Sequence, residues 1–86
     1  RIEGVYIGDL LSWVMGRAKE NDAWITIMSN INTAAVAALA DVSCIILAEG
    51  VNLEDDVLNV VKEKRINVIL SNLPTYETAV ELSKML

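Results

Sequence analysis

The residues of this chain that could do chemistry lie directly after its short apolar runs. Asp9 follows Gly8 after the first run, and Glu49 precedes Gly50 after the third. Asp9 could bind a ribose hydroxyl, an amine or a metal-bound water, and Asp9 with Glu49 could hold Mg²⁺, because carboxylate oxygens suit this ion. The full set of candidate ligand-binding residues contains small polar residues and two glycines: Gly8, Asp9, Ser12, Ser29, Asn30, Asn32, Thr33, Glu49, Gly50, Ser71, Asn72 and Thr75.

The same residue types have a second explanation, which is helix capping. Serine, threonine, aspartate and asparagine commonly begin helices, where the side chain accepts a hydrogen bond from the backbone. In this interpretation Asp9 is the N-cap of a first helix, and Gly50 supplies a left-handed turn beside a solvated Glu49. The residue types alone leave both interpretations open.

Catalytic groups are scarce. The chain has no histidine, which removes imidazole acid–base and triad chemistry. Its single cysteine, Cys44, lies inside an aliphatic run and is predicted to be a core residue. Neither a P-loop nor a dinucleotide-binding glycine motif is present. We therefore predict that the chain is not an enzyme, and its sequence identifies no cofactor. Because one cysteine cannot form an internal disulfide, we expect a reduced, cytoplasmic setting.

Strands and helices are expected to alternate along the whole chain. Four apolar runs recur at similar spacing, at residues 5–7, 23–28, 44–48 and 67–70. The last two are continuous aliphatic runs, which are typical of strands buried on both faces of a parallel sheet. Helical patterns occupy the intervals, at residues 9–19, 32–40, 53–65 and from 74 to 86. The alternation predicts one domain over residues 1–86, an α/β fold with a mainly parallel four-stranded sheet and helices on both faces.

Several details of the helices and aromatic residues are also predicted. Asn30 or Asn32 is expected to cap the second helix, and Asn52 is expected to cap the third. Trp24 is expected in the sheet core, whereas Trp13 falls between core positions of the first helix and is a candidate for an interface or a sheet edge. The final helix is expected to begin near Pro74 and to turn four side chains inward, those of Tyr76, Ala79, Val80 and Ser83.

The candidate residues are expected to meet at one edge of the sheet. In open parallel sheets, ligands bind beyond the carboxyl ends of the strands. Helix N-termini at that edge present unpaired N–H groups to an anion. A small anionic metabolite or a nucleotide is therefore the expected kind of ligand.

Composition limits the classes of partner. The net charge is −5 and no basic face is visible, which excludes nucleic acid and an anionic membrane surface. The longest apolar stretch, residues 34–51, is interrupted by Asp41, Ser43 and Glu49, so no transmembrane segment is expected, and no signal peptide is recognisable. A chain of 86 residues that is 53% hydrophobic is rich for a free monomer, so we expect a homodimer or docking to a larger protein.

Four segments resemble the DRTGG domain family, and together they cover nearly the whole chain. Asp9 is followed by Leu10 where the family has Asp-Arg, and Glu49-Gly50 stands in place of the Gly-Gly. The resembling segments are Gly8-Asp9-Leu10-Leu11-Ser12-x-Val14-Met15, Asp22-Ala23-Trp24-Ile25-Thr26, Asn32 with Ala35-Val36-Ala37, and Ile45-Ile46-Leu47-Ala48-Glu49-Gly50.

The resemblance implies an α/β module that is similar to the N-terminal domain of HPr kinase/phosphorylase, a domain without the catalytic P-loop. Stand-alone members with the Gly-Asp-Leu-Leu-Ser form resemble proteins encoded near iron-only hydrogenases. This favours a regulatory or assembly role, often as a dimer, and assigns no catalytic residues.

Three hypotheses follow from the residues and the resemblance. The first is a non-catalytic regulatory module that binds a ligand or a protein at the polar edge. The second is a structural homodimerisation or docking domain. The third is a metal-dependent enzyme that uses Asp9 and Glu49.

Overall fold

The computed structural model describes residues 2–86, which form four strands and four helices in strict alternation. This confirms the predicted α/β class. The strands are β1 (Gly4–Ile7), β2 (Asp22–Thr26), β3 (Cys44–Leu47) and β4 (Val68–Leu70). The helices are α1 (Leu11–Arg17), α2 (Ile31–Ala40), α3 (Asp55–Glu63) and α4 (Thr75–Ser83).

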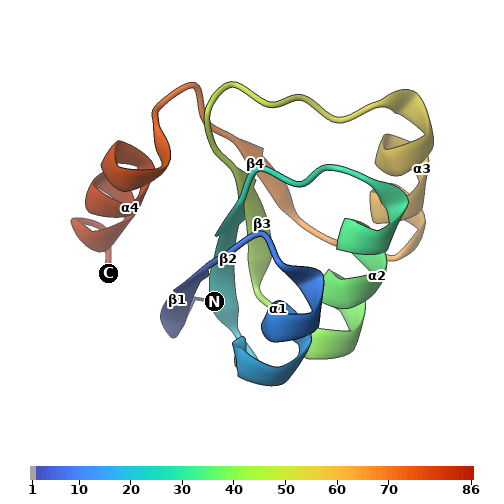
Figure 1. The fold of residues 1–86 in the computed structure, drawn as a ribbon, viewed down its shortest axis with the longest axis horizontal. Helices are drawn as coiled ribbons and strands as arrows, with labels where there is room; N and C mark the ends of the chain where they lie inside the picture. The colour runs from blue at the N-terminus through green and yellow to red at the C-terminus, as the bar shows by residue number, and fades with distance from the viewer. Residues whose placement is uncertain (1) are drawn as a thin grey trace.

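The sheet has the order β1-β2-β3-β4, and every neighbouring pair is parallel. Because each crossover steps to the next strand in the same direction with the same hand, its helix lies on the same face each time. Helices α1, α2 and α3 therefore cover one face, and α4, which follows the last strand, folds back onto the other (Figure 1). Helices on both faces were predicted, but their unequal distribution was not.

The larger core lies between the sheet and helices α1–α3. Trp24 is completely buried there, as predicted, and packs with Val14 of α1 and Ala37 of α2. Its indole nitrogen donates to the carbonyl oxygen of Gly8 at 2.9 Å, which satisfies the one polar atom of this ring. The alanine-rich helix α2 also buries Ala34 against Val57 of α3, so small side chains here allow close helix packing.

The second core lies under α4 and is smaller. Leu82 of α4 packs on the central strands β2 and β3, where Ala23, Ile25, Cys44 and Ile46 are buried. Strand register places four isoleucines in one row across this face: Ile7, Ile25, Ile46 and Ile69. Their exposed fractions are 50%, 0%, 4% and 50%, so α4 covers the central pair and leaves both edge residues half exposed.

Two helix predictions were wrong, and long-range contacts explain both. Helix α3 begins after Glu54 rather than Asn52, because Val51 and Leu53 pack into the apolar clusters as extended chain before the helix starts. Helix α4 turns Thr78 and Leu82 toward the sheet, with Ala79 partly buried, whereas three residues predicted to point inward are not in this core: Tyr76, Val80 and Ser83.

Two other element boundaries lie close to their predicted positions. Pro74 is the N-cap residue of α4, directly before the helix. The second strand ends at Thr26, so Ile27 and Met28 belong to the loop that follows it.

Candidate functional site

Asp9 joins the ends of β1 and β2. Its Oδ1 accepts a hydrogen bond from the Thr26 hydroxyl at 2.7 Å and another from the Ile27 amide at 3.0 Å. The Thr26 oxygen accepts in turn from the Met28 amide at 3.2 Å. Asp9 does not cap α1, whose N-cap residue is Leu10 without a side-chain bond. The carboxylate thus serves the structure of this edge in a way that neither interpretation of the sequence anticipated.

Gly8 is needed for close approach at the same edge. A Cβ atom at this position would lie 3.0 Å from the Tyr6 ring, which is tighter than ordinary carbon contacts allow. The glycine lets the Gly8 carbonyl reach the Trp24 indole and leaves the chain free to turn toward α1. Ser12 is exposed in the first turn of α1.

Glu49 performs a similar task at the ends of β3 and β4. Its Oε2 accepts from the Thr75 amide at 2.7 Å and from the Thr75 hydroxyl at 3.2 Å, at the start of α4. Proline at position 74 has no side-chain cap to offer, so Glu49 replaces it from a distant loop. Glu49 and Gly50 both adopt positive φ, +64° and +74°, which turns the chain back toward β4.

The turn at Gly50 brings the last candidate residues together. The Gly50 amide donates to the Ser71 carbonyl at 2.9 Å, and a Cβ on Gly50 would lie 3.7 Å from the Asn72 amide oxygen. The Ser71 and Thr78 hydroxyls share a hydrogen bond of 2.9 Å, which helps to fix the rotation of α4. Ser71, Asn72 and Thr75 therefore surround one turn with Glu49, and they are separate from Asp9.

The N-terminus of α2 carries the remaining candidates. Asn30 is its N-cap: the Asn30 side chain accepts from the Thr33 amide at 3.1 Å, and the Thr33 hydroxyl accepts from the Asn30 amide at 3.4 Å. This reciprocal capping box decides between Asn30 and Asn32, which the sequence left open. Thr33, which takes part in the capping box, is buried, whereas Asn32 is exposed.

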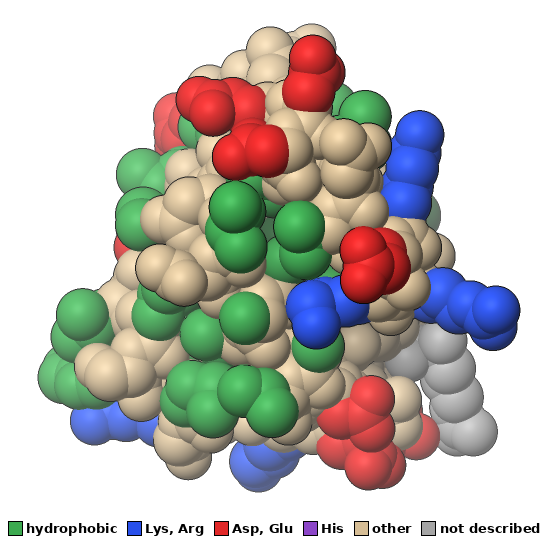
Figure 2. Space-filling view, turned by 90° about the vertical axis from the view of Figure 1, so that its right-hand side faces the viewer, with side chains coloured by type: hydrophobic (Ala, Val, Ile, Leu, Met, Phe, Trp, Pro, Cys, Tyr) green, Lys and Arg blue, Asp and Glu red, His purple; other side chains and the backbone are tan. Residues whose placement is uncertain are grey.

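An open cleft of about 690 Å³ separates the start of α2 from the start of α3. Glu54 and Asp56 lie on its α3 side, opposite Ser29, Asn30 and Asn32. Acidic side chains gather at the end of the molecule where α3 begins (Figure 2). Two carboxylates make this cleft better suited to a cation or an amine than to an anionic metabolite.

The candidate residues thus form three separate groups rather than one pocket. The Asp9 carboxylate accepts hydrogen bonds at the end of β2, and the Glu49 carboxylate accepts hydrogen bonds at the start of α4. Within residues 2–86, no three metal-ligating side chains lie close enough to hold an ion. Burial raises the pKa of the Cys44 thiol, which keeps it protonated and unreactive in the core.

Trp13 is half exposed, at 52%. The Arg17 guanidinium stacks over its ring, with the Cζ atom 3.8 Å from the ring centroid. One face of the indole is therefore covered by the chain's own cation. A partner that approaches Trp13 meets an arginine as well as an aromatic ring.

The sequence model of the DRTGG domain family matches residues 2–85. The chain belongs to the DRTGG domain family. This family consists of small domains of regulatory type, which agrees with a non-catalytic module. A search of the curated proteins found no match. In the described part of this DRTGG domain, no helix is long and apolar enough to cross a membrane.

Proposed function

We propose that this DRTGG domain is a regulatory module that acts by docking to another protein. The observation that carries the proposal is the incomplete cover of the α4 face. Ile7 and Ile69 of the isoleucine row are half exposed on either side of α4, as are Val5 of β1 and Leu73 before α4. A parallel sheet is normally buried on both faces, so apolar side chains left exposed on one face favour a protein partner.

The polar edge supports this choice over ligand sensing. The acceptor groups that could have held a ligand, the Asp9 and Glu49 carboxylates, are engaged within the domain. No described buried side-chain nitrogen or oxygen lacks a hydrogen-bond partner, so no interior polar group calls for a ligand. We also propose that the domain works in the reducing cytoplasm, where its buried Cys44 stays a free thiol.

Site-specific photo-crosslinking in the source cells tests the docking function. A crosslinking side chain at Tyr76, which is 75% exposed on α4, is expected to give a discrete adduct with one protein. The same side chain at Leu39, 73% exposed on α2, is the matched control on the opposite face. The partner, identified and purified, should bind the purified domain. If it does not, or if only a second copy of the chain is captured, docking to another protein is wrong, and a captured second copy supports homodimerisation instead.

A small-molecule site is the second candidate, and the cleft between α2 and α3 favours it. Its polar lining combines amides and two carboxylates in an open space of about 690 Å³. Thermal-shift measurements with amines, nucleosides and nucleotides test this function. A compound that stabilises the wild-type domain but not Asn32→Ala or Asp56→Asn would support a ligand-binding role. Stabilisation that persists in both variants would exclude the cleft.

A further inference from the structure

The face that carries α4 is too wide for one helix. Four strands about 4.8 Å apart are as broad as two helices about 10 Å in diameter. Helix α4 covers the central strands β2 and β3, and it leaves Ile69 of β4 half exposed on one side and Ile7 of β1 half exposed on the other. Helices α1, α2 and α3 lie on the opposite face of the same sheet (Figure 1). On the β4 side of α4, an uncovered strip of this face therefore remains.

This strip is an apolar groove between α4 and β4. It has two adjoining parts of about 250 and 710 Å³, which share Ile69, Leu82 and Met85. Ile46 of β3 lies in its floor. Met85 is 76% exposed and Leu86, at the end of the groove, is 60% exposed. With such exposed walls the groove is an open trough, which suits a long occupant better than a small ligand that needs enclosure.

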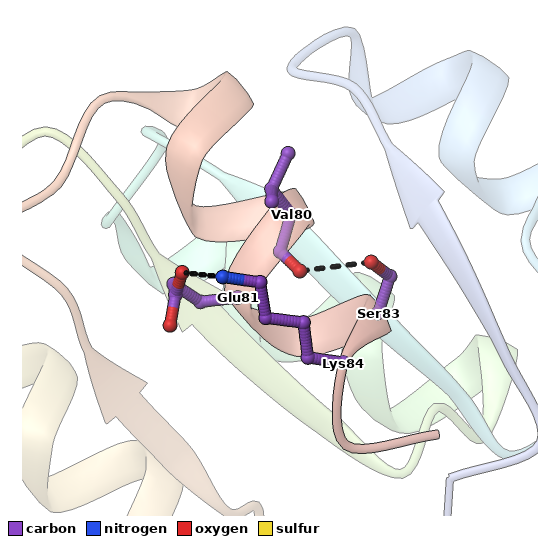
Figure 3. A network of polar contacts seen from close by, with 4 residues as sticks. All are labelled: Val80, Glu81, Ser83 and Lys84. Atoms are coloured by element: carbon purple, nitrogen blue, oxygen red, sulfur yellow. Dashed lines mark hydrogen bonds and ion pairs between the residues drawn. The ribbon is translucent and has the colours of Figure 1, made fainter.

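The α4 side of the groove is acidic. Glu81 lines the groove, and Glu77 lies one turn earlier on the same side of the helix. Glu81 Oε2 accepts a hydrogen bond from Lys84 Nζ at 2.9 Å (Figure 3). The two side chains are 56% and 65% exposed, and a surface pair of this kind contributes little to stability. A cation from a partner can therefore compete with Lys84 for Glu81.

We propose that this groove binds an amphipathic helix of a partner protein. The helix places apolar side chains on Ile69 and Met85, and its flank toward Glu77 and Glu81 carries lysine or arginine. The inference rests on the proposed docking function and assigns its surface and partner chemistry. Charge disfavours a second copy of this chain, because a two-fold contact between α4 helices would bring the same glutamates together.

Two synthetic helical peptides of about 14 residues, or four turns, test the groove. Both carry one leucine stripe, and they differ only in one flank, which is lysine in the first and glutamate in the second. In NMR titrations of the labelled domain, the lysine peptide is expected to shift the amide signals of Ile69, Leu82 and Met85 and to leave Ile7 unchanged. The glutamate peptide is expected to bind at least about tenfold more weakly.

Matched variants test whether the peptide binds in the groove and not elsewhere on the domain. Ile69→Lys should weaken the lysine peptide at least about tenfold. Leu39→Lys is the control, because Leu39 is 73% exposed on α2, on the opposite face of the sheet. Lys84→Gln should strengthen the lysine peptide by freeing Glu81, and Glu81→Lys should reverse the preference between the two peptides. Amide spectra of each variant check that the fold is intact.

Three results would overturn the groove assignment. The first is equal affinity of the domain for the two peptides, and the second is signal shifts outside the groove. The third is a dimer in sedimentation experiments that the Ile69→Lys substitution dissociates, because the occupant of the groove would then be a second copy of the chain. The docking function fails separately. If a purified partner binds Ile69→Lys as tightly as wild type, docking stands and the groove is wrong, whereas the lack of any partner removes the docking function itself.

Discussion

At the end of β1, the Asp9 carboxylate holds two donors of the neighbouring strand, the Thr26 hydroxyl and the Ile27 amide. The Thr26 side chain is 2% exposed, so removal of the Asp9 carboxylate leaves its buried hydroxyl without this hydrogen-bond acceptor. We expect Asp9→Ala to lower the free energy of unfolding by about 1–3 kcal/mol, the cost of an unsatisfied buried polar group. Urea denaturation measures this change.

Asp9→Asn is the matched control, because an amide oxygen at the same position can still accept both hydrogen bonds. Its loss should be smaller than that of Asp9→Ala. In a Thr26→Val background the effect of Asp9→Ala should shrink, since the buried donor is gone. An Asp9→Ala domain as stable as wild type would contradict the structural role and return Asp9 to the list of ligand residues.

Among the elements, α2 depends on one of two asparagines at its start. Asn30 forms the capping box with Thr33, whereas the exposed Asn32 makes no side-chain bond that the structure describes. Asn30→Ala is expected to lower the free energy of unfolding by about 1 kcal/mol. Asn32→Ala is expected to leave it within about 0.5 kcal/mol of the wild-type value. Thermal and chemical denaturation of the two variants compare them directly. Equal losses would show that the capping box is not the source of the stability.

For the whole molecule, Leu82 is the main attachment of the α4 layer. It is 6% exposed and packs on both central strands, with Ala79 and Ile2 at its side. Leu82→Ala should lower the free energy of unfolding by about 2–4 kcal/mol. This is a large share of the total free energy of unfolding of a small domain. Leu39→Ala, on the outside of α2 at 73% exposure, should change it by less than about 0.5 kcal/mol.

Hydrogen exchange locates the loss. In the Leu82→Ala domain, amides of α4 should exchange through a local opening before those of β2 and β3. Uniform exchange across all four helices would mean instead that α4 unfolds only with the whole domain.

Local patterns predicted much of this fold. The aliphatic run predicted as a buried strand at residues 44–48 forms β3 over Cys44–Leu47, buried on both faces, and Trp24 lies in the core as predicted. The rotation of α4 could not be predicted in the same way. Tyr76 and Val80 have the spacing of an inward stripe, but Glu49 and Ser71 bind the first turns of the helix and set Thr78 and Leu82 against the sheet.

The sequence by itself determined the order of strands and helices, their number and the parallel sense of the sheet, because side-chain periodicity and short crossovers act over a few residues. Only the tertiary structure decided what each polar residue binds. Asp9 meets Thr26 across 17 positions and Glu49 meets Thr75 across 26, which no local pattern encodes. It also decided that three helices share one face, because consecutive crossovers of one hand leave α4 by itself on the other.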